Sequence, residues 1–197
     1  MKQVILQEFV SIDGLAAAQN GSVDFVPSAN RGDQSLGQHQ VEFMDLIDTI
    51  LLGRITYEMF AGYWPNATTR DDKELAEKIN STPKVVFSRT LHRAPWGKWD
   101  NVRIVNTKPA EEVAKLRDGS GKDMVIWGSL SLAQALMNAG QIDQYQLIVC
   151  PVVLGNGRPL FPEKNGLHDM TLLTSRSFDR GSVLLSYASG NGASENR

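Results

Sequence analysis

Short apolar runs alternate with amphipathic helical patterns along most of the chain. Runs rich in Val, Ile and Leu predict buried strands over residues 4–10, 49–52, 84–87, 102–105 and 123–127. Apolar positions at helical spacing predict helices at 38–48, 54–63, 72–80 and on either side of the strand at 123–127. This alternation of strands and helices is typical of an α/β domain.

The last part of the chain follows a different pattern. Three strands are expected with no helical pattern between them, at 145–154, 171–178 and 182–187. Without crossover helices, the sheet should end in an antiparallel hairpin. Residues 19–37 are polar and rich in Gly and Asn, and they are too long for an ordinary connection, so we expect a functional loop there. We expect one domain over 1–188 and a flexible tail over 189–197, which lacks an apolar anchor.

Small or hydroxylated residues follow three of the predicted strands, at points where a helix is expected to begin. The three segments are Gly53-Arg54-Ile55-Thr56-Tyr57, Ser88-Arg89-Thr90 and Gly128-Ser129-Leu130-Ser131. Free amides and the helix dipole suit phosphate at such positions, and glycine lets a phosphate approach the backbone. Arg54 and Arg89 add guanidinium groups that match phosphate oxygens. Each segment alone could equally be a turn with an N-cap serine, but together they predict a site for a nucleotide with several phosphates.

Composition narrows the class of ligand and excludes several kinds of site. The chain has 197 residues, of which 42% are hydrophobic, and a formal net charge of −2. Proteins that bind nucleic acid through its phosphates are usually basic, so no such partner is expected. The single cysteine, Cys150, lies in an apolar run and is expected to be buried, and an internal disulfide is excluded. His39, His92 and His168 show no ligand spacing, so no metal site is predicted.

Neither a secretion signal nor a membrane segment is expected. Gln and Glu interrupt the first apolar run too early for a signal peptide. No stretch of about 18 uncharged apolar residues could span a bilayer. We therefore expect a cytoplasmic protein without membrane partners.

Two common nucleotide-binding fingerprints are missing. Residues 155–160 have Leu where the G-x-G-x-x-G pattern needs its last glycine, and there is no Walker A sequence. The motifs instead resemble the dihydrofolate reductase superfamily, and within it the reductase domain of riboflavin biosynthesis. The resemblance covers about residues 2–188 and rests on Ser11-Ile12-Asp13-Gly14, Gly53-Arg54-Ile55-Thr56-Tyr57, Val85-Val86-Phe87-Ser88-Arg89, Val125-Ile126-Trp127-Gly128-Ser129 and Pro151-Val152-Val153-Leu154-Gly155-Asn156-Gly157-Arg158-Pro159-Leu160-Phe161.

This resemblance implies a fold and a cofactor. The fold is a three-layer α/β/α arrangement whose central sheet is mostly parallel and ends in an antiparallel hairpin. The cofactor is NADPH. The resemblance implies that Gly53, Arg54 and Thr56 contact its phosphates and that Ser88 and Arg89 contact its adenosine end. It also implies that Gly128, Ser129 and Leu130 lie against its diphosphate. Members of the superfamily often have successive glycines at the last of these turns, so the close approach must be made at Gly128 here.

The residue that supplies a proton stays open at this point. Dihydrofolate reductases place an Asp or Glu near the start of the helix before the Gly-Arg junction, where it holds the pteridine. The matching position here falls near Gly37, and the nearest carboxylates, Asp33 and Glu42, only flank it. The candidate catalytic residues are Asp24, His39 and Asp13. Each could instead be a solvated or turn residue, and Trp64 is either a ring that stacks on a planar substrate or a core residue.

We expect an NADPH-dependent reductase that transfers a hydride to a C=N or C=O group of a planar pterin- or pyrimidine-like molecule. One alternative is a non-catalytic NADPH-binding regulatory or interaction protein. Another is the 5-amino-6-(5-phosphoribosylamino)uracil reductase of riboflavin biosynthesis, although the zinc motif of its deaminase partner is absent from the chain. A homodimer is expected, because the last strands would leave an apolar face formed by Leu172, Leu173, Val183, Leu184 and Leu185.

Overall fold

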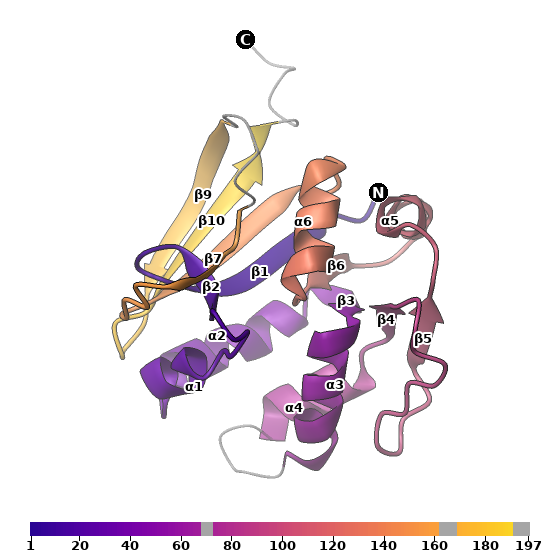
Figure 1. The fold of residues 1–197 in the computed structure, drawn as a ribbon, viewed down its shortest axis with the longest axis horizontal. Coiled ribbons are helices and arrows are strands. Elements are labelled where there is room, and N and C mark those ends of the chain that lie inside the picture. The colour runs from indigo at the N-terminus through magenta and orange to yellow at the C-terminus, as the bar shows by residue number, and fades with distance from the viewer. Residues whose placement is uncertain (68–72, 162–168, 191–197) are drawn as a thin grey trace.

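The fold is built on one large sheet with helices on both faces (Figure 1). The computed structural model describes residues 1–67, 73–161 and 169–190. The strands are β1 (Val4–Ser11), β2 (Leu15–Ala18), β3 (Ile47–Gly53), β4 (Lys84–Phe87), β5 (Val102–Val105), β6 (Asp123–Ile126), β7 (Gln144–Cys150), β8 (Gly157–Pro159), β9 (Met170–Ser177) and β10 (Val183–Ser189). The helices are α1 (Phe25–Asn30), α2 (Gln34–Met44), α3 (Arg54–Tyr63), the 3-10 helix η1 (Trp64–Asn66), α4 (Lys73–Ser81), α5 (Pro109–Arg117) and α6 (Leu130–Asn138).

The large sheet has the strand order β5-β4-β3-β6-β1-β7-β10-β9. All neighbours from β5 to β7 are parallel, whereas β10 is antiparallel to β7 and β9 is antiparallel to β10. The predicted mostly parallel sheet with an antiparallel C-terminal hairpin is therefore confirmed. A separate two-stranded ribbon pairs β2 with β8.

Two hydrophobic clusters hold the helices against opposite faces of the sheet. The cluster under α2, α3 and α4 buries Phe43, Tyr57 and Ile79, and the cluster under α5 and α6 buries Val113 and Leu136. Burial of one such side chain stabilises the fold by about 1.5–3 kcal/mol. Because α3 follows β3 directly and α6 follows β6 after a short turn, both helices begin at the same edge of the sheet (Figure 1). None of the helices in the described ranges is long and apolar enough to cross a membrane.

The prediction of one long loop over 19–37 is wrong, because this stretch contains α1 and the start of α2. Asp33 caps α2 by accepting the backbone N–H of Leu36 at 3.0 Å, so the helix begins before its apolar periodicity does. The side chain of Asn30 donates to the sulfur of Cys150 on β7 at 3.3 Å and holds α1 against the sheet. Cys150 is buried, as predicted.

Other boundaries differ by a few residues. The strand predicted over 145–154 ends at Cys150, because Pro151 has no N–H for the ladder. The predicted tail at 189–197 begins too early, since Ser189 is the last residue of β10. Residues 191–197 of that tail lie outside the described residues.

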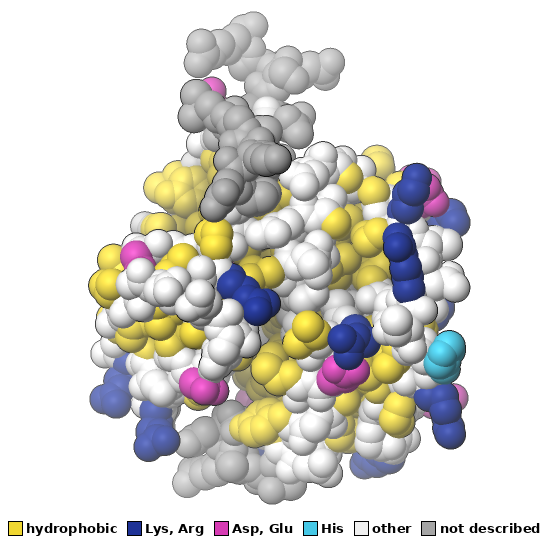
Figure 2. All heavy atoms as spheres, viewed as in Figure 1, with side chains coloured by type: hydrophobic (Ala, Val, Ile, Leu, Met, Phe, Trp, Pro, Cys, Tyr) yellow, Lys and Arg dark blue, Asp and Glu magenta, His cyan; other side chains and the backbone are white. Residues whose placement is uncertain are grey.

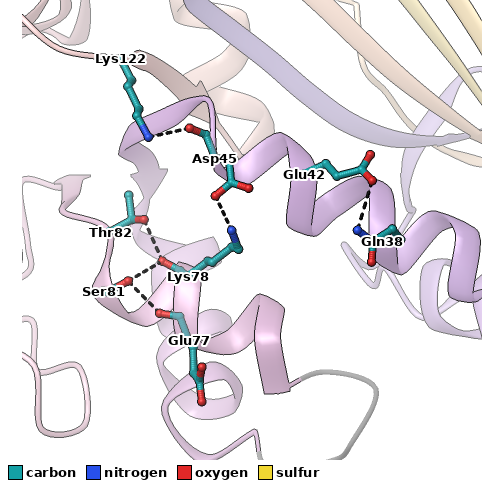
Figure 3. Close-up of polar contacts among 8 residues, drawn as sticks. All are labelled: Gln38, Glu42, Asp45, Glu77, Lys78, Ser81, Thr82 and Lys122. Atoms are coloured by element: carbon teal, nitrogen blue, oxygen red, sulfur yellow. Dashed lines mark hydrogen bonds and ion pairs between the residues drawn. The ribbon is translucent and has the colours of Figure 1, made fainter.

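The helices α2 and α4 are tied together at their ends (Figure 3). Asp45, which follows α2, forms an ion pair with Lys78 of α4. The backbone carbonyl of Asp45 also accepts a hydrogen bond at 2.7 Å from the side chain of Lys122, the residue just before β6. These contacts join α2, α4 and the start of β6.

A buried polar cluster fixes the connection between β4 and β5. Asn80 accepts the indole N–H of Trp96 at 2.7 Å and donates to the carbonyl of Trp64 at 3.0 Å. The ammonium of Lys84 donates to the carbonyls of Asn80 and Thr82 and lies 4.4 Å from the centre of the Trp96 ring. Trp96 is thereby held in the core, and the segment after β4 returns to the sheet in one position.

Candidate functional site

A cavity of about 380 Å³ opens at the carboxyl ends of β3 and β4, beside the N-termini of α3 and α6. Its lining residues are Gly53, Arg54, Ile55, Phe87, Ser88, Arg89, Thr90, Pro109, Ser129, Ser131 and Leu132. All three segments predicted to bind phosphate contribute to this list. The structure therefore brings together residues that are about 35 and 75 positions apart in the chain, as expected for strand ends of a parallel sheet.

Two glycines allow the walls of this cavity to meet. A Cβ on Gly53 would lie 2.2 Å from the hydroxyl oxygen of Ser129, and a Cβ on Gly128 would lie 2.8 Å from that of Thr56. Gly128 also has a φ of +80°, which disfavours any side chain. The Gly128–Ser129 peptide bond is cis. Larger residues at either position would push apart the loops that shape the cavity.

Helix termini and arginines give the cavity a positive character. Ser129 forms no capping hydrogen bond at the start of α6, and Gly53 has no side chain to cap α3, so the first amides of both helices remain without a side-chain cap. Such amides and the helix dipole attract anions. Arg54 pairs with Glu58 at 2.9 Å, whereas Arg89 is exposed and forms no ion pair within the described ranges. On the face in Figure 2, Lys and Arg side chains lie in small separate groups, several of them beside Asp or Glu side chains.

The second predicted junction differs from the other two, because no helix follows β4. The Ser88 hydroxyl instead accepts the backbone N–H groups of Thr90 and Leu91 at 3.2 and 3.0 Å, which closes a turn. The expectation of a helix start at 88–90 is therefore wrong. Ser88 and Arg89 nevertheless lie in the wall of the cavity.

A carboxyl group that sequence reasoning did not select lies behind the Gly128 turn. The Oε1 atom of Glu8 on β1 is fully buried and has no hydrogen-bond partner within the described part of the chain. This atom lies 3.4 Å from the point where a Cβ of Gly128 would stand, and the hydroxyl oxygen of Thr56 lies 2.8 Å from the same point. Burial raises the pKa of Glu8 to about 8. A sequence signal existed: a charged residue in the central strand of a parallel sheet, which is covered on both faces.

The opposite face of β1 carries a network of buried amides. Gln7 accepts the indole N–H of Trp127 at 2.8 Å and the amide N–H of Gln40 at 3.0 Å, and it donates to Gln146 at 2.9 Å. Because an indole nitrogen only donates, Trp127 fixes the orientation of these amides. The Oε1 atom of Gln40 is left buried without a partner within the described ranges. The buried face of α2 thus turns an amide toward β1, not a carboxylate.

The residues predicted as catalytic do not line the cavity. Asp24 is exposed at the start of α1. The His39 ring packs 5.4 Å from that of Phe178, beside β9, and burial lowers its pKa. Asp13 accepts the backbone N–H groups of Leu154 and Gly155; the Ser11 hydroxyl and these N–H groups lower its pKa to about 2.

Trp64, predicted as a substrate-stacking or core residue, is half-buried at the edge of the core under α2, α3 and α4. Its ring lies 6.1 Å from that of Phe60 and 5.1 Å from that of Tyr63. Trp64 is not among the residues that line the cavity. Within the described ranges, no three His, Cys, Asp or Glu side chains gather as metal ligands.

Comparison with known proteins gives one family and a shared fold. The model of the RibD C-terminal domain matches residues 2–184. The chain is 35% identical over 188 residues to the uncharacterised protein YyaP of Bacillus subtilis (strain 168), with 94% of each chain covered. A candidate riboflavin biosynthesis protein from Shewanella sp. PV-4 matches with a TM-score of 0.74 at 23% identity, over 96% of this chain and 99% of that one. Dihydrofolate reductase from Enterococcus faecalis, complexed with NADP(H) and RAB-propyl, matches with a TM-score of 0.59 at 12% identity, over 95% and 96%.

Proposed function

The chain belongs to the family of the RibD C-terminal domain, and from this premise we propose that it is an NADPH-dependent reductase. Its substrate would be a planar pyrimidine- or pterin-like molecule that carries a C=N or C=O group. The observation that carries the proposal is the cavity, because it gathers Gly53-Arg54, Ser88-Arg89 and Ser129 at one sheet edge.

The residues of this cavity fit a dinucleotide with several phosphates. Two helices begin there without side-chain caps, which leaves amide donors for a diphosphate. Gly53 and Gly128 let the neighbouring loops approach closely, because a Cβ on either would meet Ser129 or Thr56. Arg89 forms no ion pair with any described residue and would bind the additional 2′-phosphate that distinguishes NADPH from NADH.

NADPH, when bound, supplies a hydride from its reduced nicotinamide ring. The chain's own residues would hold the cofactor in the places that the family resemblance implies: Gly53, Arg54 and Thr56 at the phosphates, Ser88 and Arg89 at the adenosine end, Gly128, Ser129 and Leu130 at the diphosphate. Thr56, Gly128 and Leu130 are not among the residues that line the cavity. The helix dipoles of α3 and α6 add to the attraction without any charged side chain.

A second candidate is a protein that binds NADPH without catalysis. Two observations favour it: the buried face of α2 presents Gln40 instead of a carboxylate, and none of the predicted catalytic residues lines the cavity. A reductase would then have to obtain its proton from another group or from water.

Oxidation of NADPH in the presence of a substrate panel separates these candidates. The panel contains pterins, dihydropterins and amino-pyrimidines, including 5-amino-6-(5-phosphoribosylamino)uracil. A reductase consumes NADPH only when one of these compounds is present and loses that activity in an Arg54→Ala, Arg89→Ala double variant. Tight NADPH binding without turnover on any compound favours the binding protein. Failure to bind NADPH at all contradicts both.

A further inference from the structure

Glu8 lies on β1 just beyond the residues that pair with β6. β1 pairs with β6 over residues 4–6 only, but it pairs with β7 as far as Ser11. Beyond Leu6, the edge of β1 that faces β6 therefore has no strand partner among the described residues. Glu8 lies on this stretch, next to the turn that leads from β6 into α6.

The side chain of Glu8 points to the face that α6 covers. Strand side chains alternate, and Val4, Leu6 and Val10 all belong to the cluster under α5 and α6. The carboxyl group consequently reaches the Gly128 turn, where Thr56 of α3 also arrives. Thr56 and Gly128 are two of the residues assigned above to the phosphates of the cofactor. The Glu8 carboxyl lies next to both, and none of the three residues is among those that line the cavity.

An ionised carboxylate at this position would repel a diphosphate, and its Oε1 atom is buried without a donor within the described ranges. A neutral carboxylic acid removes the repulsion and adds a donor. We propose, on the basis of the proposed function, that Glu8 binds the cofactor's diphosphate as a neutral acid whose O–H group donates a hydrogen bond to a phosphate oxygen. In alkaline solution, cofactor binding then takes up one proton from the solvent, which neutralises the Glu8 carboxylate.

The titratable groups around Glu8 do not favour its ionised form. From α3, Arg54 lines the cavity, but it pairs with Glu58 on the exposed side of that helix. From β7, Tyr145 lies on the same face of the sheet, and burial raises its pKa, so it stays neutral. No residue of α6 is titratable. Burial is the cause that raises the pKa of Glu8 to about 8, and an anion bound above the carboxyl would raise it further.

The test measures dissociation constants at about pH 7 and about pH 9, a range in which phosphate groups stay fully ionised because their second pKa is about 6. Three ligands are compared: NADPH, 2′-phosphoadenosine diphosphate ribose, which has the diphosphate but no nicotinamide, and adenosine 2′,5′-bisphosphate, which lacks the diphosphate. For the first two, affinity should fall about tenfold over this range, because the fraction of neutral Glu8 falls by that factor. The third should show no such fall.

The Glu8→Gln variant keeps the shape of the side chain and a donor but cannot titrate. Its affinity for NADPH should match that of the wild type at about pH 7 and should not fall toward about pH 9. Glu42→Gln, which removes an exposed carboxylate from α2, is the matched control and should keep the wild-type fall. Lys84 also titrates in this range, with a pKa that burial lowers to about 7, but it is present in every variant and cancels.

Calorimetry in buffers of different ionisation enthalpy gives a second readout, because it counts protons directly. Wild type should take up nearly one proton per NADPH at the higher pH, and Glu8→Gln should take up none. A pH-independent affinity in wild type, a fall that persists in Glu8→Gln, or a fall seen only with NADPH would overturn the role of Glu8 while leaving NADPH binding intact. Absence of binding by all three ligands at both pH values would overturn the proposed function as well.

Discussion

The backbone N–H of Gly53 donates to the carbonyl oxygen of Gly128 over 3.0 Å. This bond joins the end of β3 to the turn after β6, so the N-termini of α3 and α6 are held beside each other. The close approach depends on both residues being glycine, since a Cβ on either would meet Ser129 or Thr56 at less than 3 Å. The proposed phosphate site is thus a consequence of backbone packing, and side chains only complete it.

Gly128→Ala tests this packing. The added methyl group meets the Thr56 hydroxyl and the backbone has a positive φ, so we expect a loss of about 1–2 kcal/mol in stability and at least tenfold weaker NADPH binding, about 1.4 kcal/mol. Gly32→Ala is the matched control, because Gly32 has a φ of +68° and no atom within 4 Å of its Cβ position. It should lose comparable stability but bind NADPH normally. Equal binding losses in both variants would show that strain, not the turn, matters.

Asn80→Ala tests the cluster that holds the segment after β4. The variant leaves the indole N–H of Trp96, which is 1% exposed, without its acceptor, and we expect a loss of about 2–3 kcal/mol in the free energy of unfolding. Ser81→Ala, at an exposed neighbour, should cost less than about 0.5 kcal/mol. Combining Asn80→Ala with Trp96→Phe should cost less than the sum of the two single changes, because the unpaired donor is gone. Additive urea-unfolding energies would contradict this.

Glu8 makes stability depend on pH in a predictable direction. Its pKa is raised from 4.5 to about 8 in the folded chain, so between these values the folded state binds more protons than the unfolded one. Stability from this group is therefore complete below about pH 4.5 and is lost as pH rises through about 8. Glu8→Gln should gain stability relative to wild type as pH rises, by more than about 1 kcal/mol. Unfolding curves whose difference stays constant with pH would contradict a buried acid.

The expected homodimer would cover the exposed edge of the sheet. β9 is the last strand, and its Leu172 and Leu173 are 53% and 54% exposed. We expect light scattering to give twice the mass of one chain at micromolar concentration, and Leu173→Lys to give the single mass. Leu46→Lys, at an equally exposed leucine before β3, should remain dimeric. A wild-type protein with the mass of one chain would contradict the expectation.

Much of the fold follows from local sequence signals. The helix at 54–63 has the bounds predicted for it, because Gly53 precedes it and Pro65 follows shortly after. The three segments of the candidate site were also predictable, since Gly, Ser and Arg at strand ends indicate phosphate chemistry, and parallel strands bring their carboxyl ends to one edge.

Other parts depend on contacts that only the folded chain makes. Gln7 and Glu8 interrupt the apolar run of β1, but the run does not indicate what these side chains contact in a central strand between β6 and β7. The start of α2 depends on the cap formed by Asp33. This cap lies before the first apolar positions at helical spacing, so the apolar pattern does not indicate it. The sequence leaves open whether Asp13 is a catalytic or a turn residue, and its partners are backbone amides more than a hundred residues away.

The most direct test of the account is calorimetric titration with NADPH and with NADH. Wild type should bind NADPH more tightly than NADH. Arg89→Ala and Arg54→Ala should each reduce the ratio of the two dissociation constants, by about tenfold where a charge-assisted contact to the 2′-phosphate is lost. Arg31→Ala, which removes an exposed arginine at the end of α1, should leave both affinities unchanged. Equal dissociation constants for NADPH and NADH in wild type would contradict the assignment of this cavity to NADPH.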